Sequence, residues 1–227
     1  MEVVEIFESI SGEVGTNILQ GELTNFIRFA GCSVGCDWCD AKYSWSSAQD
    51  LYIPTIIDKL CESNLRNLII TGGEPFEQKE ILPFLWEAEA VLDNIAIETS
   101  GYNVPDEMFE DFPNIPLIID YKPKSANVKV PREEINDFNI FFNLAKKDVI
   151  KFPFMSNEEL KEAVAVAKKV EKHFDGLRQE SPVLAFSPII TEEMHSYELF
   201  SFLHKYLLAN KVNGVINLQI HKILGAQ

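Results

Sequence analysis

The sequence has few of the residues that a disulfide framework or a basic binding surface requires. It contains 4 cysteines and 4 histidines in 227 residues, and its 20 lysines and arginines are outnumbered by 35 aspartates and glutamates. A formal net charge of −15 argues against a nucleic-acid partner, because phosphate backbones attract basic proteins. Three of the four cysteines lie together, which is a poor disulfide framework for a chain of this size.

Long apolar runs are missing as well. The first residues, Met1 to Glu5, contain no basic segment that leads into an apolar run, and no stretch approaches the roughly eighteen apolar residues of a membrane span. We therefore expect neither export nor membrane insertion, and we expect a cytoplasmic protein. With 46% hydrophobic and 24% charged residues, the composition is that of a globular protein, and we expect one domain over residues 1–227.

The clustered cysteines are Cys32, Cys36 and Cys39, in the spacing C-x3-C-x2-C. A structural zinc ion normally takes four protein ligands, but Cys61 follows more than twenty residues later and the first histidine is His173. A [4Fe-4S] cluster held by three cysteines leaves one iron open to another ligand. A disulfide or a zinc knuckle is the alternative, although three cysteines cannot all pair with one another.

Strands and helices alternate along most of the sequence. We expect strands at 23–30, 67–71, 95–99, 116–121, 149–152, 182–188 and 215–221, and helices at 54–61, 79–92, 157–174 and 195–209. Such alternation predicts a parallel sheet in an α/β fold, and about six units are too few for a full eightfold barrel. The sequence therefore predicts a partial (β/α)6-type barrel, in which residues 122–147 either cover the barrel or meet a second subunit.

Polar and turn residues gather where the predicted strands end, which is where such folds place their sites. Thr71-Gly72-Gly73-Glu74-Pro75 follows one strand, and its two glycines would let the backbone approach a ligand closely while Glu74 accepts from an ammonium group. A plain loop is the alternative interpretation of this segment. Ser100 and the segment Asp120-Tyr121-Lys122 end the two strands that follow.

The cysteine spacing, with the aromatic Trp38 just before the last cysteine, resembles the signature of the radical S-adenosylmethionine (SAM) enzymes. The resemblance implies a radical SAM barrel, a [4Fe-4S] cluster on the three cysteines, and SAM on the open iron as the source of a 5′-deoxyadenosyl radical. It also implies a set of SAM contacts: Trp38, Asp40, Gly72, Gly73, Glu74, Ser100, Asp120, Tyr121 and Lys122.

Further segments resemble the 7-carboxy-7-deazaguanine synthase family of queuosine and 7-deazapurine biosynthesis. They are Phe7 to Glu13, Phe26 to Cys32, Cys39-Asp40 with Tyr43 and Trp45, Glu98 to Gly101, Lys122 to Ser125, and Leu218 to Lys222. These segments run from one end of the chain to the other. The Gln-x-His-Lys segment at 219–222 discriminates best, because activating enzymes with the same cysteine motif have no reason to carry it.

This second resemblance implies a lyase that converts 6-carboxy-5,6,7,8-tetrahydropterin to 7-carboxy-7-deazaguanine with loss of ammonia. Arg28 offers a fork for a carboxylate group, and the other implied substrate contacts are Ile10, Ser11, Gly12, Thr71, His221 and the terminal carboxylate of Gln227. No residue is assigned as a catalytic acid or base. The resemblance also implies an electron donor such as flavodoxin, and we expect a homodimer.

Ala41 departs from the family pattern, which has threonine or serine after Cys-Asp, and Ser11 and Val14 are smaller departures. The family's hydroxyl group helps to hold a Mg²⁺ ion beside the substrate carboxylate, and alanine offers no such ligand. The sequence therefore predicts turnover without Mg²⁺, with a lysine in place of the ion. Lys42 is nearest in sequence, and Lys122, Lys124 and Lys151 are the alternatives.

Two other functions share the cysteine motif. A glycyl-radical activating enzyme would act on a protein backbone, and turnover of the pterin separates it from the lyase. A non-enzymatic iron-sulfur electron carrier would not cleave SAM, so release of 5′-deoxyadenosine excludes that class.

Overall fold

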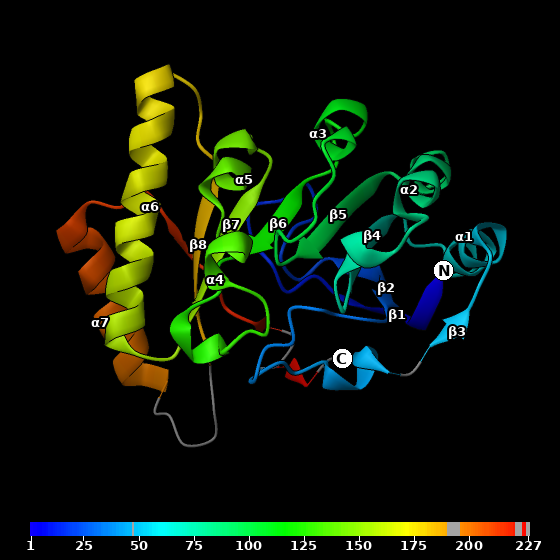
Figure 1. The fold of residues 1–227 in the computed structure, drawn as a ribbon, viewed down its shortest axis with the longest axis horizontal. Helices are drawn as coiled ribbons and strands as arrows, with labels where there is room; N and C mark the ends of the chain where they lie inside the picture. Colours follow the sequence, from blue (N-terminus) through cyan, green and yellow to red (C-terminus); the bar gives the residue numbers. More distant parts are fainter. Residues whose placement is uncertain (47, 190–195, 221–223, 226–227) are drawn as a thin grey trace.

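An open, mostly parallel β-sheet forms the centre of the molecule (Figure 1). The computed structural model describes residues 1–46, 48–189, 196–220 and 224–225, and within these ranges the sheet has nine strands in the order β3-β1-β2-β4-β5-β6-β7-β8-β9. The strands are β1 (Glu2–Ile10), β2 (Leu23–Phe29), β3 (Gln49–Asp50), β4 (Asn67–Gly72), β5 (Asn94–Thr99), β6 (Leu117–Asp120), β7 (Val149–Phe154), β8 (Val183–Pro188) and β9 (Val215–Ile216). Neighbours from β2 to β9 are parallel, and β1 and β3 pair antiparallel at one edge, so the predicted partial barrel is confirmed.

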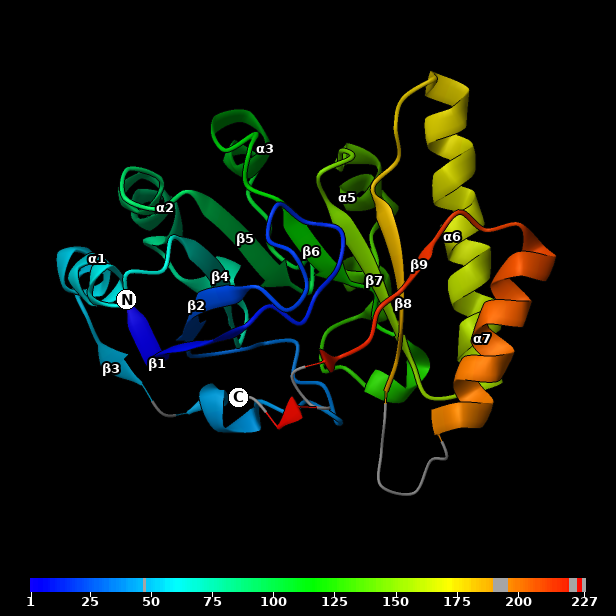
Figure 2. The same ribbon diagram turned by 180° about the vertical axis from the view of Figure 1, so that it is seen from behind.

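Helices connect the parallel strands and pack on the outer face of the sheet (Figures 1 and 2). They are α1 (Ile53–Glu62), α2 (Ile81–Glu89), α3 (Glu107–Asp111), α4 (Arg132–Ile135), α5 (Phe138–Asn143), α6 (Asn157–Leu177) and α7 (Ser196–Asn210), with short 3-10 turns η1 (Lys42–Trp45), η2 (Pro75–Glu77) and η3 (Lys124–Ala126). The main hydrophobic core lies between these helices and the strands. Within the described ranges, no helix is both long and apolar enough to span a bilayer.

The inner face of the sheet carries a smaller apolar layer. It is formed by one residue from each of six parallel strands together with Ile18 from the N-terminal loop: Phe26, Ile69, Ala96, Ile118, Val149 and Ala185. Because side chains alternate between the two faces of a strand, the residue two positions later points to the same inner face, nearer the strand's carboxyl end. The apolar layer is therefore the floor beneath the next ring of side chains.

One predicted strand differs clearly from the structure. The strand expected at 215–221 ends at Ile216, because Asn217 Nδ2 donates to Glu13 Oε2 at 2.7 Å and Ile220 N then turns back to Leu218 O at 2.7 Å. Residues 122–147 lie against the cysteine loop, with Asp37 N donating to Ala126 O at 2.8 Å. This segment therefore covers one end of the partial barrel.

Candidate functional site

A cavity of about 400 Å³ opens at the carboxyl ends of the parallel strands. Each of six strands contributes the residue two positions beyond its floor residue, giving the ring Arg28, Thr71, Glu98, Asp120, Lys151 and Ser187. The cysteine loop, the turn after β4 and the N-terminal loop complete the wall, with Cys32, Cys36, Cys39, Trp38, Asp40, Ala41, Tyr43, Gly72, Gly73, Glu74, Ser100, Lys122, Ile10, Gly12, Glu13 and Gln219. The cavity is thus polar above an apolar floor.

The three cysteines of the motif face this cavity. Cys36 is buried, Cys32 and Cys39 are half-buried, and all three are free thiols. Burial raises the pKa of Cys36 to about 11 and also raises the pKa of Cys32, and thiolates at the neighbouring cysteines add to the shift at Cys36. Because the protein alone disfavours the thiolate form, a positively charged metal centre must displace the protons.

The turn after β4 is docked onto the cysteine loop. Gly73 N donates to Phe29 O at 2.9 Å, and Glu74 N donates to Gly31 O at 2.8 Å. A Cβ atom at Gly73 would lie 1.6 Å from Gly31 O, and one at Gly72 would lie 2.3 Å from Phe29 O. The glycines are therefore required by contact with the neighbouring strand and cysteine loop, which is a different reason from the close approach to a ligand expected from the sequence.

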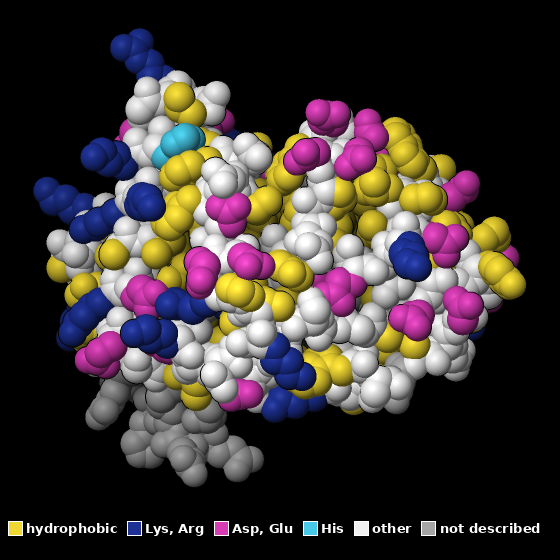
Figure 3. All heavy atoms as spheres, in the orientation of Figure 1, with side chains coloured by type: hydrophobic (Ala, Val, Ile, Leu, Met, Phe, Trp, Pro, Cys, Tyr) yellow, Lys and Arg dark blue, Asp and Glu magenta, His cyan; other side chains and the backbone are white. Residues whose placement is uncertain are grey.

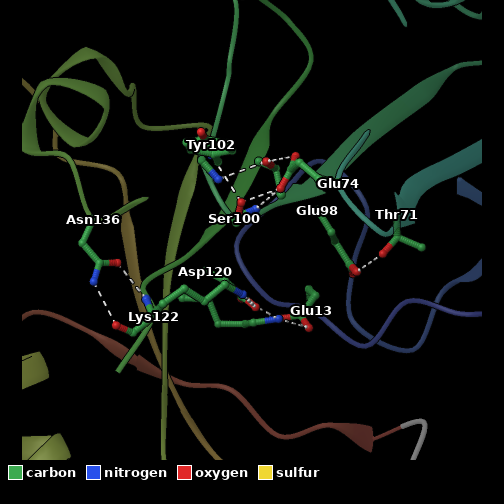
Figure 4. A network of polar contacts seen from close by, with 12 residues as sticks. Glu13, Thr71, Glu74, Glu98, Ser100, Tyr102, Asp120, Lys122 and Asn136 are labelled. Atoms are coloured by element: carbon green, nitrogen blue, oxygen red, sulfur yellow. Dashed lines mark hydrogen bonds and ion pairs between the residues drawn. The ribbon is translucent and has the colours of Figure 1, made fainter. Parts of the chain in front are cut away.

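Glu74 is buried and heavily hydrogen-bonded. Its carboxylate accepts from Thr99 Oγ1 at 2.5 Å and from Ser100 N at 2.9 Å, and the Ser100 hydroxyl also donates to it (Figure 4). Burial raises the pKa of Glu74, and these donors act in the opposite direction. Glu74 thus ties the end of β5 to the turn after β4 beside the cysteines.

Buried charges form a chain across the cavity, centred on Asp120 (Figure 4). Lys122 Nζ lies 3.0 Å from Asp120 Oδ2, and Lys151 Nζ lies 3.0 Å from both Asp120 Oδ1 and Glu13 Oε1. Burial alone would raise the pKa of Asp120, but the two lysines outweigh it and hold that pKa below its usual value. Burial would lower the pKa of Lys151, but the surrounding carboxylates hold it well above its usual value.

Glu98 is a carboxyl group on the cavity wall whose burial is only partly offset by favourable contacts with its neighbours. Its carboxylate accepts a hydrogen bond from Thr71 Oγ1 at 2.9 Å. Burial and the nearby Glu13 carboxylate raise the pKa of Glu98 to about 7, despite the attraction of Lys151. At neutral pH this side chain is divided between its acid and carboxylate forms, so it can both donate and accept a proton.

Arg28 is held at the wall of the cavity by contacts on both sides. Its Nε donates to Glu5 Oε1 at 2.7 Å, and its guanidinium carbon lies 5.5 Å from the Phe7 ring centroid and 5.7 Å from that of Tyr43. Tyr43 Oη also donates to Glu5 Oε1, at 2.7 Å. Since one Glu5 oxygen accepts from the Nε edge, the guanidinium plane is fixed in orientation.

The N-terminal loop is fastened to the segment after β9. Gln20 Nε2 donates to Gly12 O at 2.9 Å and to Leu218 O at 2.7 Å. Asn217 is fully buried, and its Nδ2 donates to Glu13 Oε2 at 2.7 Å. The N-terminal loop and the segment after β9 therefore close the same side of the cavity.

Most of the predicted site residues meet in this cavity, but three do not line it. Ser11 is buried beside the loop backbone, and Lys42 is exposed with its Nζ 6.0 Å from the Trp45 ring centroid. Tyr121 points to the helix side, where it packs on Phe152 and its Oη donates to Glu162 Oε1 at 2.6 Å. His221 and Gln227 lie outside the described residues.

The sequence prediction missed Glu13 and Glu98 as site residues, and it named Lys151 only as an alternative for the lysine that replaces Mg²⁺. A signal for two of them was present, because Glu98 and Lys151 are the polar residues two positions after the inner apolar residues Ala96 and Val149. A lysine within an otherwise apolar strand, as at Val149–Phe154, is a mark of a paired or functional position.

Known sequences resemble this chain over nearly its whole length. It is 33% identical to 7-carboxy-7-deazaguanine synthase of Clostridium acetobutylicum over 232 aligned residues, which cover 98% of this chain and 95% of that protein. It is 27% identical to the protein of the same name from Methanospirillum hungatei, over 99% of this chain and 86% of that protein. A family model described as a 4Fe-4S single cluster domain matches residues 19–115.

Solved structures share the fold. QueE from Escherichia coli superposes with a TM-score of 0.64 at 20% identity, covering 96% of this chain and 92% of that one. Streptococcus suis SuiB bound to S-adenosylmethionine superposes with a TM-score of 0.58 at 13% identity, covering 85% of this chain and 51% of that one.

The partial barrel, the three-cysteine loop and the glycine turn docked on it define a radical SAM enzyme, whose cofactors are a [4Fe-4S] cluster and S-adenosylmethionine. Within that class, the identity and coverage given above place the chain in one family. It belongs to the 7-carboxy-7-deazaguanine synthase family.

Proposed function

We propose that this chain converts 6-carboxy-5,6,7,8-tetrahydropterin to 7-carboxy-7-deazaguanine with loss of ammonia, a radical SAM lyase step of queuosine and 7-deazapurine biosynthesis. Membership of the synthase family supports this reaction. The observation that carries it is the shared cavity: the three cysteines and the ring of strand-end charges lie on the wall of the same space. A radical generated at the cysteines would therefore reach a polar substrate without leaving the protein.

Cys32, Cys36 and Cys39 would hold the cluster, since they are free thiols on one loop with no fourth cysteine beside them. When bound, the cluster and SAM supply a 5′-deoxyadenosyl radical for hydrogen abstraction. The turn from Gly72 to Glu74 and the side chain of Ser100 would position SAM, as would Trp38, Asp40, Asp120 and Lys122. All of these lie on the cavity wall.

We assign Arg28, Thr71, Gly12 and Ile10 to the substrate, together with Glu98. Arg28 presents a fixed guanidinium fork, which suits the carboxylate of the pterin. Glu98 has a pKa of about 7, which suits a group that accepts a proton from the pterin ring or donates one as ammonia leaves. The apolar floor excludes water from the opposite side of the substrate.

Position 41 does not fit a Mg²⁺ ion. The Ala41 side chain carries no oxygen, and its carbonyl oxygen already accepts from Ser44 N at 2.9 Å and Ser44 Oγ at 2.7 Å. We infer that turnover needs no Mg²⁺ and that a cavity lysine takes the place of the ion. Lys122 and Lys151 are buried on the wall, whereas Lys42 is exposed outside it, so the proposal moves from Lys42 to these two.

Metal-stripped enzyme tests the Mg²⁺ proposal. Turnover should be the same with and without added Mg²⁺, and Lys122→Met or Lys151→Met should abolish it. Strong stimulation of the wild-type enzyme by Mg²⁺ would refute the proposal.

The electron donor and the oligomeric state are part of the same proposal. We infer a low-potential one-electron carrier such as flavodoxin as the donor, because the cluster would have to be reduced by one electron before SAM is cleaved. We also infer a homodimer. Light scattering on the anaerobically purified protein measures the dimer directly, and a monomeric mass would contradict it.

An anaerobic assay tests the reaction. Reconstituted, reduced protein with SAM and 6-carboxytetrahydropterin should release 7-carboxy-7-deazaguanine and ammonia in equal amounts. Release of 5′-deoxyadenosine with no deazaguanine product would remove the lyase assignment and leave the activating-enzyme alternative. Failure to cleave SAM at all would favour the electron-carrier alternative.

A further inference from the structure

Lys122 lies just beyond the point where the sheet holds the chain. The register of β6 with β7 ends at Asp120 and Lys151, and Tyr121 N makes the next bond, to Lys151 O at 2.8 Å. Lys122 follows, and Pro123 after it has no N–H group to donate. The position of Lys122 is therefore set by partners other than the neighbouring strands.

The side chain of Asn136 takes the place of a neighbouring strand (Figure 4). Lys122 N donates to Asn136 Oδ1 at 2.8 Å, and Asn136 Nδ2 donates to Lys122 O at 2.9 Å. One carboxamide thus pairs both backbone groups of Lys122, as a peptide group of an adjacent strand would. Because Lys122 is only 7% exposed, an unpaired backbone group there would be costly.

Arg132, at the start of α4, supports the same backbone group. Its Nε donates to Lys122 O at 2.7 Å, and a terminal nitrogen donates to Tyr121 Oη at 2.8 Å and to Glu162. Tyr121 Oη in turn donates to Glu162 Oε1 at 2.6 Å, which connects these residues to α6. The carbonyl oxygen of Lys122 therefore accepts from two side chains, and its orientation is fixed by both.

The helix α4 also packs against the cysteine loop. Ile135 is 1% exposed and belongs to a small hydrophobic core that contains Cys36. The outer side of α4 faces solvent: Glu133 and Glu134 are exposed, and Figure 3 shows acidic side chains at the surface where α4 lies in Figure 1. The inner contacts of α4 and of the residue after it thus join the backbone of Lys122 to the loop that carries the cysteines.

We propose that Asn136 is a positioning residue that holds the Lys122 ammonium where it binds the carboxylate of SAM. The inference rests on the proposed function, in which Lys122 contacts SAM. Lys122 Nζ lies 3.0 Å from Asp120 Oδ2 and 5.9 Å from the Trp38 ring centroid, so the ammonium lies beside the cysteine motif. An ammonium has three N–H donors, and Asp120 accepts from one of them, so the others serve an anionic ligand.

The ion pair with Asp120 does not by itself fix the ammonium. Asp120 and Lys122 lie on one segment, so they move together if the chain after β6 moves. Without the carboxamide of Asn136, the N–H and C=O groups of Lys122 lose their partner in a place mostly closed to water. The backbone then shifts toward solvent, and a shift of about 1 Å is enough to weaken a positioned contact.

Two measurements on Asn136→Leu and Asn136→Ala test the proposal. Leucine keeps the approximate size of the side chain without its polar atoms, and alanine removes both hydrogen bonds without adding apolar bulk. The first measurement is the exchange rate of the Lys122 amide hydrogen in the metal-free protein, which needs no ligand. The second is the Kd of SAM for reconstituted enzyme with wild-type iron content, compared with the Kd of the pterin. Asn139→Leu, at an exposed position of α5, is the matched control.

We expect the Lys122 amide to exchange at least about tenfold faster in both Asn136 variants, and the Kd of SAM to rise about fivefold while that of the pterin stays within about twofold. Lys122→Met should raise the Kd of SAM at least as much. The double variant Asn136→Leu/Lys122→Met should bind SAM no more weakly than Lys122→Met, because Asn136 acts through Lys122.

Wild-type SAM affinity in the Asn136 variants would overturn the proposal, as would an equal loss in Asn139→Leu, a loss confined to the pterin, or losses that add in the double variant. A wild-type enzyme that does not bind SAM would refute the proposed function instead. The amide exchange rates would then still decide whether Asn136 holds Lys122.

Discussion

Cys36 is the most buried of the three cysteines in the motif, and it depends most on a metal centre. Its thiol has a pKa of about 11 without metal, so an unloaded protein keeps this cysteine protonated. The fourth cysteine, Cys61, is exposed on α1 and lies outside the cavity wall. Substitutions at Cys36 and Cys61 therefore compare an expected cluster ligand with a cysteine that lies away from the cavity.

We predict that Cys36→Ala loses the cluster and with it SAM cleavage, whereas Cys61→Ala keeps both. Three thiolates hold the cluster, and losing one leaves a second iron without a protein ligand. Iron content and visible absorbance after anaerobic reconstitution measure the first effect, and 5′-deoxyadenosine release measures the second. About four irons per chain in Cys36→Ala would contradict the ligand assignment.

Glu98 makes the stability of the folded protein depend on pH. Its pKa is raised from 4.5 to about 7 on folding, so the unfolded chain holds fewer protons on this group between these values. The contribution of Glu98 to the free energy of unfolding is therefore greatest below pH 4.5 and falls as pH rises toward 7.

We predict that the substitution Glu98→Gln removes this decrease in the free energy of unfolding with rising pH. Between about pH 5 and pH 8, the free energy of unfolding of the wild type should drop relative to that of the variant by at most about 3 kcal/mol. Urea titrations of both proteins across this range measure the difference. Glu133→Gln, at an exposed position of α4, is the control and should follow the wild type within about 0.5 kcal/mol. A difference between wild type and Glu98→Gln that does not change with pH would show that Glu98 is ionised throughout.

At the scale of elements, the turn after β4 and the helix α6 use glycine in opposite ways. Gly73 lies against the backbone of Gly31, with no room for a Cβ atom. Gly176, near the end of α6, has no atom within 4 Å of the position that a Cβ would take. The first glycine fixes how two loops dock, and the second only adds freedom to the unfolded chain.

We predict that Gly73→Ala destabilises the protein by more than about 4 kcal/mol or prevents cluster assembly, because backbone must move on both sides of the contact. Gly176→Ala should raise the free energy of unfolding by about 0.5 kcal/mol. Chemical denaturation of both anaerobically prepared proteins gives the comparison. A Gly73→Ala protein with wild-type stability would mean that the turn and the cysteine loop are not in contact.

At the scale of the whole molecule, acidic residues outnumber basic ones by 35 to 20, and mutual repulsion opposes the compact state. Several ion pairs, among them that of Lys151 with Glu13, are buried and are little affected by salt. Salt should therefore act mainly on the repulsion at the surface.

We predict that the free energy of unfolding rises by about 1 kcal/mol when NaCl is raised from about 0.01 M to about 0.5 M, because the screening length falls well below the spacing of surface charges. Urea titrations at the two salt concentrations measure it. Sucrose at matched osmolality controls for effects other than screening. A decrease in stability with NaCl would mean that surface ion pairs outweigh repulsion.

The sequence predicted several strands and helices correctly, but it predicted where they end less accurately. The alternation of apolar runs predicted β4, β5, β7 and α6 close to their observed bounds, because periodicity depends only on backbone geometry. The strand expected to reach residue 221 ended at Ile216, since side chains of Gln20 and Asn217 bind the backbone and loop there instead of another strand. No local pattern could reveal those partners.

Sequence alone determined the three-cysteine loop, the glycine turn, the alternation of parallel strands with helices, and the large negative charge. Each of these is a matter of residue type and spacing along the chain. Only the tertiary structure decided that Lys151 meets Glu13, 138 positions away, and that Tyr121 turns to the helix side while its neighbours Asp120 and Lys122 face the cavity. The physical reason is that strand order and register select which side chains share a low-dielectric space, and that space then sets their charges and pKa values.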